Sequence, residues 1–174
     1  MQALHFILTA LFTLFVIAFL LRVLMPLVRA DFRNPFGEAV LKVTNPLVLP
    51  LRKIMPPGKR LDPSSVVALL IVQFAGTALL RGVAGGHLGL ESILLGGLRG
   101  LLQTVLQFYF FAVLLYALLS WFAGAAYNPA AQILSKLVEP LLTPIRRVVP
   151  PLGGLDLSAV FLLIALQALQ ILLR

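Results

Sequence analysis

Four long stretches of this chain contain no Asp, Glu, Lys or Arg, namely residues 1–21, 63–80, 100–135 and 157–173. Each is near or above the roughly 17–25 residues that an α-helix needs to cross the hydrocarbon core of a bilayer. Only 11% of the residues are charged, whereas soluble domains carry about 25%. The sequence therefore predicts a polytopic membrane protein and excludes soluble enzyme folds.

The chain contains a tandem repeat. Shifted by 94 residues, residues 20–73 align with residues 114–167 without a gap, with 18 identities in 54 positions. Gapless agreement of this kind indicates a duplicated unit. We interpret each copy as a helix, a proline-rich basic loop and a second helix. The repeated positions include Asn34/Asn128, Pro35/Pro129, Pro46/Pro140, Pro50/Pro144, Arg52/Arg146, Asp62/Asp156 and Gln73/Gln167.

These patterns predict an all-α membrane protein with four transmembrane helices, arranged as two parallel helical-hairpin repeats. The first repeat is expected at residues 1–80, with helices at about 4–27 and 63–80. Residues 81–100 form the expected outer connecting loop. The second repeat is expected at residues 101–174, with helices at about 101–122 and 157–173.

The distribution of basic residues predicts the orientation. The two repeat loops carry ten Lys and Arg residues, and the opposite side carries three, Arg81, Arg99 and Arg174. By the positive-inside rule, the repeat loops are expected to be cytoplasmic and both termini outside. Arg22, near the inner end of the first helix, is expected to extend its side chain to the interface.

Each repeat loop has a recognisable helix start. Asn34-Pro35 and Asn128-Pro129 are typical of an N-cap followed by a first-turn proline. Apolar residues then recur at helical spacing, which predicts a short amphipathic helix in the headgroup plane. A loop folded against the helix bundle is the alternative. We expect the helix of the first copy to be interrupted from Pro46 to Pro50, and Pro140 and Pro144 repeat this spacing in the second copy.

The remaining polar residues are assigned mainly structural roles. Asp62 and Asp156 precede apolar runs and are interpreted as N-caps rather than as a catalytic carboxylate pair; pairing with the arginines of the repeat is also open. Gln73 and Gln167 lie within predicted spans, where an amide either joins helices through hydrogen bonds or lines a polar pathway. We favour helix–helix hydrogen bonding.

No catalytic motif is present, so we predict a protein that is not an enzyme and that has no metal and no cofactor. The chain has 0 cysteines, which excludes disulfides, thiolate nucleophiles and Cys-ligated metals. Metalloprotease, nucleophile-elbow and phosphate-loop motifs are all missing. His5 and His87 are the only histidines, and haem binding through them is a distant alternative.

The chain resembles the YggT family of bacterial membrane proteins and its plastid relatives. The resemblance lies in motifs that both copies contain, namely Asn-Pro, the spaced prolines, Arg-Lys/Arg, Pro-Pro and Leu-Asp-x-Ser. The resemblance covers nearly the whole chain, and Pro144-Ile145-Arg146-Arg147 is similar to the family pattern. It implies links to osmotic or cation stress, to cell division or, in plastids, to cytochrome assembly and nucleoid distribution. Since the chain starts on a membrane helix without a transit-like leader, we expect a bacterial inner-membrane protein.

The leading functional hypothesis is a non-enzymatic scaffold or assembly factor. Its two basic loops would contact anionic lipid and a membrane or cytoplasmic protein through Arg52, Lys53, Arg146 and Arg147. No direct contact with nucleic acid is expected, although the net charge is +8, because the basic residues flank apolar spans. The alternative is a small channel or transport-related protein, which would require a homo-oligomer.

Overall fold

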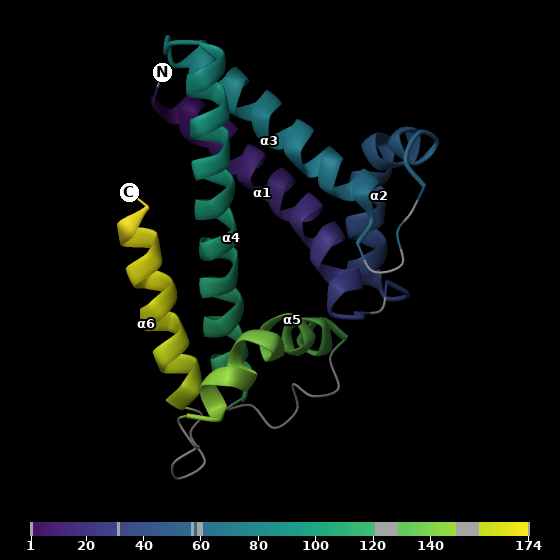
Figure 1. The fold of residues 1–174 in the computed structure, drawn as a ribbon, viewed down its shortest axis with the longest axis vertical. Helices are drawn as coiled ribbons and strands as arrows, with labels where there is room; N and C mark the ends of the chain where they lie inside the picture. Colours follow the sequence, from purple (N-terminus) through teal and green to yellow (C-terminus); the bar gives the residue numbers. More distant parts are fainter. Residues whose placement is uncertain are drawn as a thin grey trace. The chain divides into compact units, whose positions relative to one another are not determined.

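The protein consists of six α-helices in a computed structural model that describes residues 2–30, 32–56, 58, 61–120, 129–148 and 157–173 (Figure 1). In these ranges the helices are α1 (Gln2–Leu27), α2 (Pro35–Arg52), α3 (Pro63–Val83), α4 (Leu90–Ser120), α5 (Pro129–Arg146) and α6 (Leu157–Leu172). The described residues contain no β-strand. The predicted all-α class is confirmed.

Three of the described helices are long and apolar enough to cross a membrane. Their spans are Ala3–Leu27, Pro63–Val83 and Leu90–Leu119, with mean hydropathies of 2.6, 2.0 and 1.8. Helix α6 is equally apolar but has only 16 residues, which corresponds to about 24 Å of helix against a hydrocarbon core of about 30 Å. Three helices are therefore consistent with a membrane protein, and a span at α6 stays a prediction.

The expected outer loop at residues 81–100 is mostly helical. Helix α3 continues to Val83 and α4 begins at Leu90, so the connection is limited to residues 84–89. Gly85 has φ of +70°, and Gly86 N–H donates to the carbonyl of Arg81 at 2.8 Å, which is the Schellman arrangement that ends a helix. The ends of the uncharged stretches do not coincide with the ends of the helices, because Arg81 lies inside α3 and Arg99 lies inside α4.

The prolines do not interrupt the amphipathic helices, and the expected break from Pro46 to Pro50 is wrong. Helix α2 continues through Pro46 and Pro50, and α5 continues through Pro140 and Pro144. The prolines of α2 lie on its exposed face, whereas Val40, Thr44 and Val48 form the buried face. Packing of that opposite face holds the helix together, so the missing N–H groups cost little enough for helical geometry to persist.

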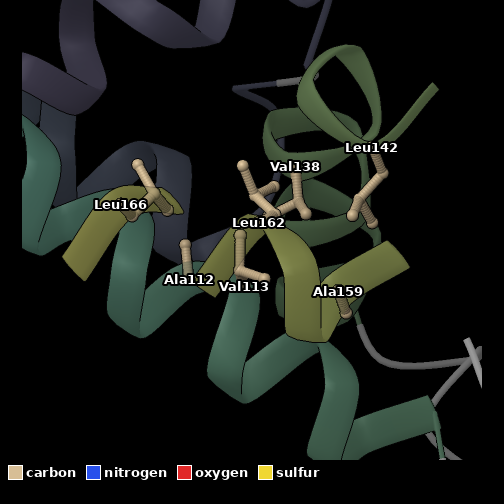
Figure 2. Close-up of a cluster of buried hydrophobic side chains, with 7 residues drawn as sticks. All are labelled: Ala112, Val113, Val138, Leu142, Ala159, Leu162 and Leu166. Atoms are coloured by element: carbon tan, nitrogen blue, oxygen red, sulfur yellow. The ribbon is translucent and has the colours of Figure 1, made fainter. Parts of the chain in front are cut away.

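The chain forms two compact units, one from residues 1–23 and 39–104 and the other from residues 24–38 and 105–174. In the first unit, α1 and α3 make contact where Phe12 reaches Gly76. In the second unit, α4, α5 and α6 enclose an apolar cluster (Figure 2). The buried members of this cluster are Ala112, Val113, Val138, Leu142, Ala159, Leu162 and Leu166.

Candidate functional site

A network of polar side chains joins the end of α2 to the start of α3. Asp62 is the N-cap of α3, with its Oδ1 accepting from the backbone N–H of Ser64 at 3.2 Å. Its Oδ2 accepts from the Ser65 hydroxyl at 2.7 Å and from Nη2 and Nε of Arg52 at 2.6 and 3.1 Å. The predicted cap is confirmed, and the same carboxylate also forms an ion pair with Arg52.

The surroundings of Asp62 favour its charged form. Burial of the carboxyl by itself raises its pKa. Hydrogen bonds from Arg52, Ser65 and the Ser64 N–H, together with the charge of Arg52, lower the pKa by more than burial raises it. The net pKa of Asp62 is therefore below its ordinary value. Because the carboxylate is held as a hydrogen-bond acceptor, its place here is structural rather than that of a proton donor.

Arg22 is buried instead of extending to the interface. Its side chain is only 3% exposed, and Nη1 donates to Thr44 Oγ1 at 3.0 Å and to Asn45 Oδ1 at 2.8 Å. The expectation that Arg22 reaches the headgroups is wrong, because two polar side chains of α2 satisfy its guanidinium inside the protein. This contact joins the C-terminal part of α1 to the middle of α2.

The second copy has a corresponding polar contact with different residues. Arg146, at the end of α5, donates to Glu139 Oε1 at 2.8 Å and to the Tyr116 hydroxyl of α4 at 3.2 Å. The 94-residue offset makes Tyr116 equivalent to Arg22, and Glu139 equivalent to Asn45. In each copy a guanidinium therefore links the long helix to the amphipathic helix. The long helix α1 supplies it in the first copy, and the amphipathic helix α5 supplies it in the second.

Sequence reasoning missed Arg22, Asn45, Tyr116 and Glu139 as members of these contacts. Identity between the two copies does not mark these positions, because Arg22 is replaced by Tyr116 and Asn45 by Glu139. A usable signal was present, since Arg22 and Tyr116 are both polar and lie next to runs of apolar residues in α1 and α4. Polar character, rather than residue identity, is what the two copies share at this position.

Four basic residues were predicted to contact lipid or a protein partner. Two of them form ion pairs within the chain, and the other two are exposed. Arg52 pairs with Asp62, and Arg146 pairs with Glu139. Lys53 and Arg147, the next residues in each copy, are exposed. Each is followed by an aliphatic side chain that is almost fully exposed, Ile54 at 79% and Val148 at 80%. We call the pairs Lys53-Ile54 and Arg147-Val148 the basic tips.

The start of α2 agrees with the predicted cap. Asn34 Oδ1 accepts from the backbone N–H of Gly37 at 2.9 Å, and Pro35 is the first residue of the helix. Pro129 likewise begins α5. The corresponding predictions for Asn128 and Asp156 lie outside the described residues.

The two equivalent glutamines have different surroundings. Gln73 is 2% exposed, and its Nε2 donates to the carbonyl of Gly97 in α4 at 3.0 Å. Close approach of these helices depends on glycine, because a Cβ at Gly97 would meet the ring of Phe74. Gln73 thus joins helices, as favoured from the sequence. Gln167 is exposed on α6.

The fold and these contacts define an all-helical membrane protein, with two copies of a unit in which a proline-containing amphipathic helix is fastened to a long apolar helix by a guanidinium. In the part of the chain that the structure describes, no group of three or more His, Cys, Asp or Glu residues is placed to hold a metal ion.

The chain belongs to the CCB3/YggT family, whose sequence profile matches residues 1–83 and 95–174. The two matched segments agree with the duplication found in the sequence, and the predicted family is confirmed.

Relatives span nearly the whole chain. An uncharacterised protein of Pseudomonas aeruginosa is 36% identical over 169 residues, which cover 96% of this chain and 86% of the relative. The uncharacterised protein YggT of Escherichia coli K12 is 34% identical over 170 residues, covering 98% and 88%. An uncharacterised protein of Vibrio alginolyticus is 33% identical over 170 residues, covering 96% and 91%. No solved structure matches the chain significantly.

Proposed function

We propose that the protein is a non-enzymatic membrane scaffold that uses its two basic tips to hold a protein partner at an anionic membrane surface. The observation that carries the proposal is the repetition of an exposed basic residue and an exposed aliphatic residue, Lys53-Ile54 and Arg147-Val148, at the ends of α2 and α5. The proposal places the protein in the bacterial inner membrane, with both tips on the cytoplasmic side.

The ion pairs within the chain support different roles for neighbouring basic residues, one structural and one for binding. Arg52 holds Asp62 at the cap of α3, and Arg146 holds Glu139 and Tyr116. These contacts fix the last turn of each amphipathic helix to its own unit. The neighbouring Lys53 and Arg147 are left at the surface, so each tip is presented on a restrained backbone, which lowers the entropy lost on binding.

The chemistry of the tips suits a headgroup layer. A Lys or Arg near an anionic membrane contributes about 1 kcal/mol, so the two tips together contribute about 2 kcal/mol in a salt-dependent way. Ile54 and Val148 supply apolar area that enters the acyl boundary. This energy favours contact of the tips with the headgroups but does not by itself hold the protein in the membrane. The apolar helices do that.

A transport role has less support. Gln73, the buried amide that a polar pathway would use, donates through Nε2 to the backbone carbonyl of Gly97 at 3.0 Å. A non-enzymatic role accords with relatives whose names state no activity, among them the Escherichia coli protein YggT.

Photo-crosslinking in growing cells tests the proposal. A photoreactive residue replaces Ile54 or Val148 in turn, and Leu88, which is 56% exposed in the connection between α3 and α4, serves as the control. We expect a discrete protein adduct at both tips and none at Leu88. Lipid adducts alone, or the same protein adducts at all three positions, would refute the scaffold.

Charge reversal provides a second test. We expect the double variant Lys53→Glu/Arg147→Glu to lose the protein adduct at Ile54, whereas the charge-conserving variant Lys53→Arg/Arg147→Lys keeps it. Both variants leave Arg52 and Arg146 in their internal pairs. An adduct that survives charge reversal unchanged contradicts the role assigned to the basic residues.

A further inference from the structure

We propose that α2 and α5 each bind the headgroup of phosphatidylethanolamine, with basic side chains holding its phosphate and backbone carbonyls accepting from its ammonium. The inference rests on the proposed function in placing the ends of both helices at a membrane surface. It is carried by a pattern of four exposed residues that occurs in both copies, a basic residue, two prolines and a second basic residue. We call this pattern the proline stripe; it consists of Lys42, Pro46, Pro50 and Lys53 in the first copy and of Lys136, Pro140, Pro144 and Arg147 in the second.

Each proline stripe lies on one side of its helix. Its members follow one another at intervals of four, four and three residues, which keep side chains on the same side of an α-helix. In α2 the buried residues Val40, Thr44 and Val48 face the other way. In α5, Val138 and Leu142 are buried in the cluster with α4 and α6 (Figure 2). Each stripe is therefore left exposed by the packing of its own unit.

Each proline of the stripe leaves a backbone carbonyl without its usual helical donor. A proline has no N–H to donate to the residue four positions earlier, and its ring crowds the carbonyl of that residue. The carbonyls affected are those of Lys42 and Pro46 in α2 and those of Lys136 and Pro140 in α5. These four residues are exposed, so each helix presents two acceptors to a donor from outside the helix.

The basic residues at the two ends of each stripe supply positive charge beside these acceptors. Lys53 follows Pro50 by three residues, and its N–H donates to the carbonyl of Pro50 at 3.2 Å, which keeps it within one turn of that proline. Lys136 donates to the carbonyl of Arg29 at 3.3 Å, but a lysine ammonium has three protons to donate and can also bind an anion. Each stripe thus combines cationic donors with neutral acceptors.

Phosphatidylethanolamine carries the complementary groups in a single headgroup. Its phosphate accepts from lysine and arginine, and its primary ammonium donates to carbonyl oxygens. A choline headgroup has the same phosphate, but its quaternary ammonium has no N–H to donate. Val43 and Leu49, which lie beside the stripe of α2 and are 44% and 49% exposed, offer apolar area to the acyl chains. The prolines therefore select among headgroups, whereas the basic residues hold the phosphate that these headgroups share.

Native mass spectrometry of the purified full chain in detergent tests this selection. The protein is offered equal amounts of phosphatidylethanolamine and phosphatidylcholine with identical acyl chains, and the retained lipids are counted by mass. We expect about fivefold more phosphatidylethanolamine than phosphatidylcholine to be retained, which corresponds to one net hydrogen bond. Equal retention of the two lipids, or a preference for phosphatidylcholine, would overturn the proposal.

Restoring the backbone donors tests the role of the prolines. In a variant with alanine at all four prolines, the new N–H groups donate to the carbonyls, and alanine also favours the helix. We expect this variant to fold and to retain the two lipids equally. Pro26→Ala, which changes the proline inside α1, is the matched control and should keep the preference. A preference that survives the fourfold substitution, or that Pro26→Ala also abolishes, contradicts the role of these carbonyls.

Substitution of the first lysine of each stripe separates this inference from the proposed function. Lys42→Gln/Lys136→Gln removes one charge from each stripe and leaves the basic tips unchanged. We expect retention of both lipids to fall about fivefold while the ratio between them persists, because both contain the phosphate. Unchanged retention would show that these lysines do not hold the phosphate. A protein adduct at Ile54 in cells, combined with no headgroup preference, would keep the scaffold and reject the headgroup site.

Discussion

Arg52 and Asp62 form an ion pair in which Nη2 and Oδ2 are 2.6 Å apart, and this pair ties the last residue of α2 to the N-cap of α3. The Asp62 side chain is 9% exposed and that of Arg52 is 37% exposed. The carboxylate therefore serves two purposes, since it caps a helix that is long and apolar enough to cross a membrane and also fixes the turn that leads into it. The Ser64 hydroxyl, which donates to the carbonyl of Met55 at 2.8 Å, holds the same turn.

Removal of the Asp62 side chain should destabilise the protein more than removal of its charge. Asp62→Ala loses the cap, and we expect the free energy of unfolding to fall by about 0.5–2 kcal/mol from that loss alone. Asp62→Asn keeps an oxygen that accepts from Ser64 N–H, so its loss should be smaller. Thermal unfolding in detergent, followed by circular dichroism, measures both; equal losses would show that the cap contributes nothing.

A double-mutant cycle with Arg52→Ala isolates the ion pair. We expect Arg52→Ala to cost less in the Asp62→Ala background than in the natural chain, because its partner is already absent. Additive effects of the two substitutions would contradict coupling between these side chains.

Stability should decline in acid because of Asp62. Its pKa is lowered in the folded protein, so the unfolded state takes up the proton first as the pH falls. The stabilisation is complete above the ordinary carboxyl range, about pH 4, and is lost as the pH falls through the folded pKa. We expect the difference in free energy of unfolding between the natural chain and Asp62→Asn to shrink between about pH 6 and pH 3. A difference that stays constant over this range would contradict the role of Asp62.

Local rules predicted the starts of α2 and α3 correctly, but not the start of α4 at Leu90. Asn34-Pro35 and Asp62-Pro63 carry both the accepting side chain and the first-turn proline within two residues, so neighbouring residues contain the needed information. That α1, α3 and α4 are apolar enough to cross a membrane followed from composition in the same way.

The failures have a common physical origin in packing. Pro46 and Pro50 break an isolated helix, but burial of Val40, Thr44 and Val48 on the other face holds α2 together. Arg22 appeared able to reach the interface, because no pattern within α1 reveals that Thr44 and Asn45 lie beside it. Contacts between segments about 22 residues apart are set by the tertiary fold rather than by local sequence.

Loss of the Asn45 amide should destabilise the first unit. Asn45→Ala removes one acceptor from the buried guanidinium of Arg22, and a buried donor left without its partner costs about 1–3 kcal/mol. Asn45→Asp keeps an acceptor and places an anion where the second copy has Glu139, so we expect a smaller loss. Unfolding midpoints in detergent compare the two; equal midpoints would mean that Arg22 does not depend on this bond.

Close contact between α3 and α4 should make Gly97 intolerant of a large side chain. A Cβ at this position already meets the Phe74 ring, and Gln73 donates to the carbonyl of Gly97 at 3.0 Å. Leucine at position 97 must therefore push the helices apart, which breaks that hydrogen bond. We expect Gly97→Leu to lower the free energy of unfolding by about 1–3 kcal/mol.

Gly82 supplies the matched control for this substitution. It is also a helical glycine, but it is exposed and a Cβ there has only Leu88 within 4 Å, at 3.9 Å. Gly82→Leu should leave stability unchanged or raise it by up to about 1 kcal/mol, because leucine favours the helix over glycine. Equal midpoints for the two variants in detergent unfolding would show that α3 and α4 are not packed through Gly97.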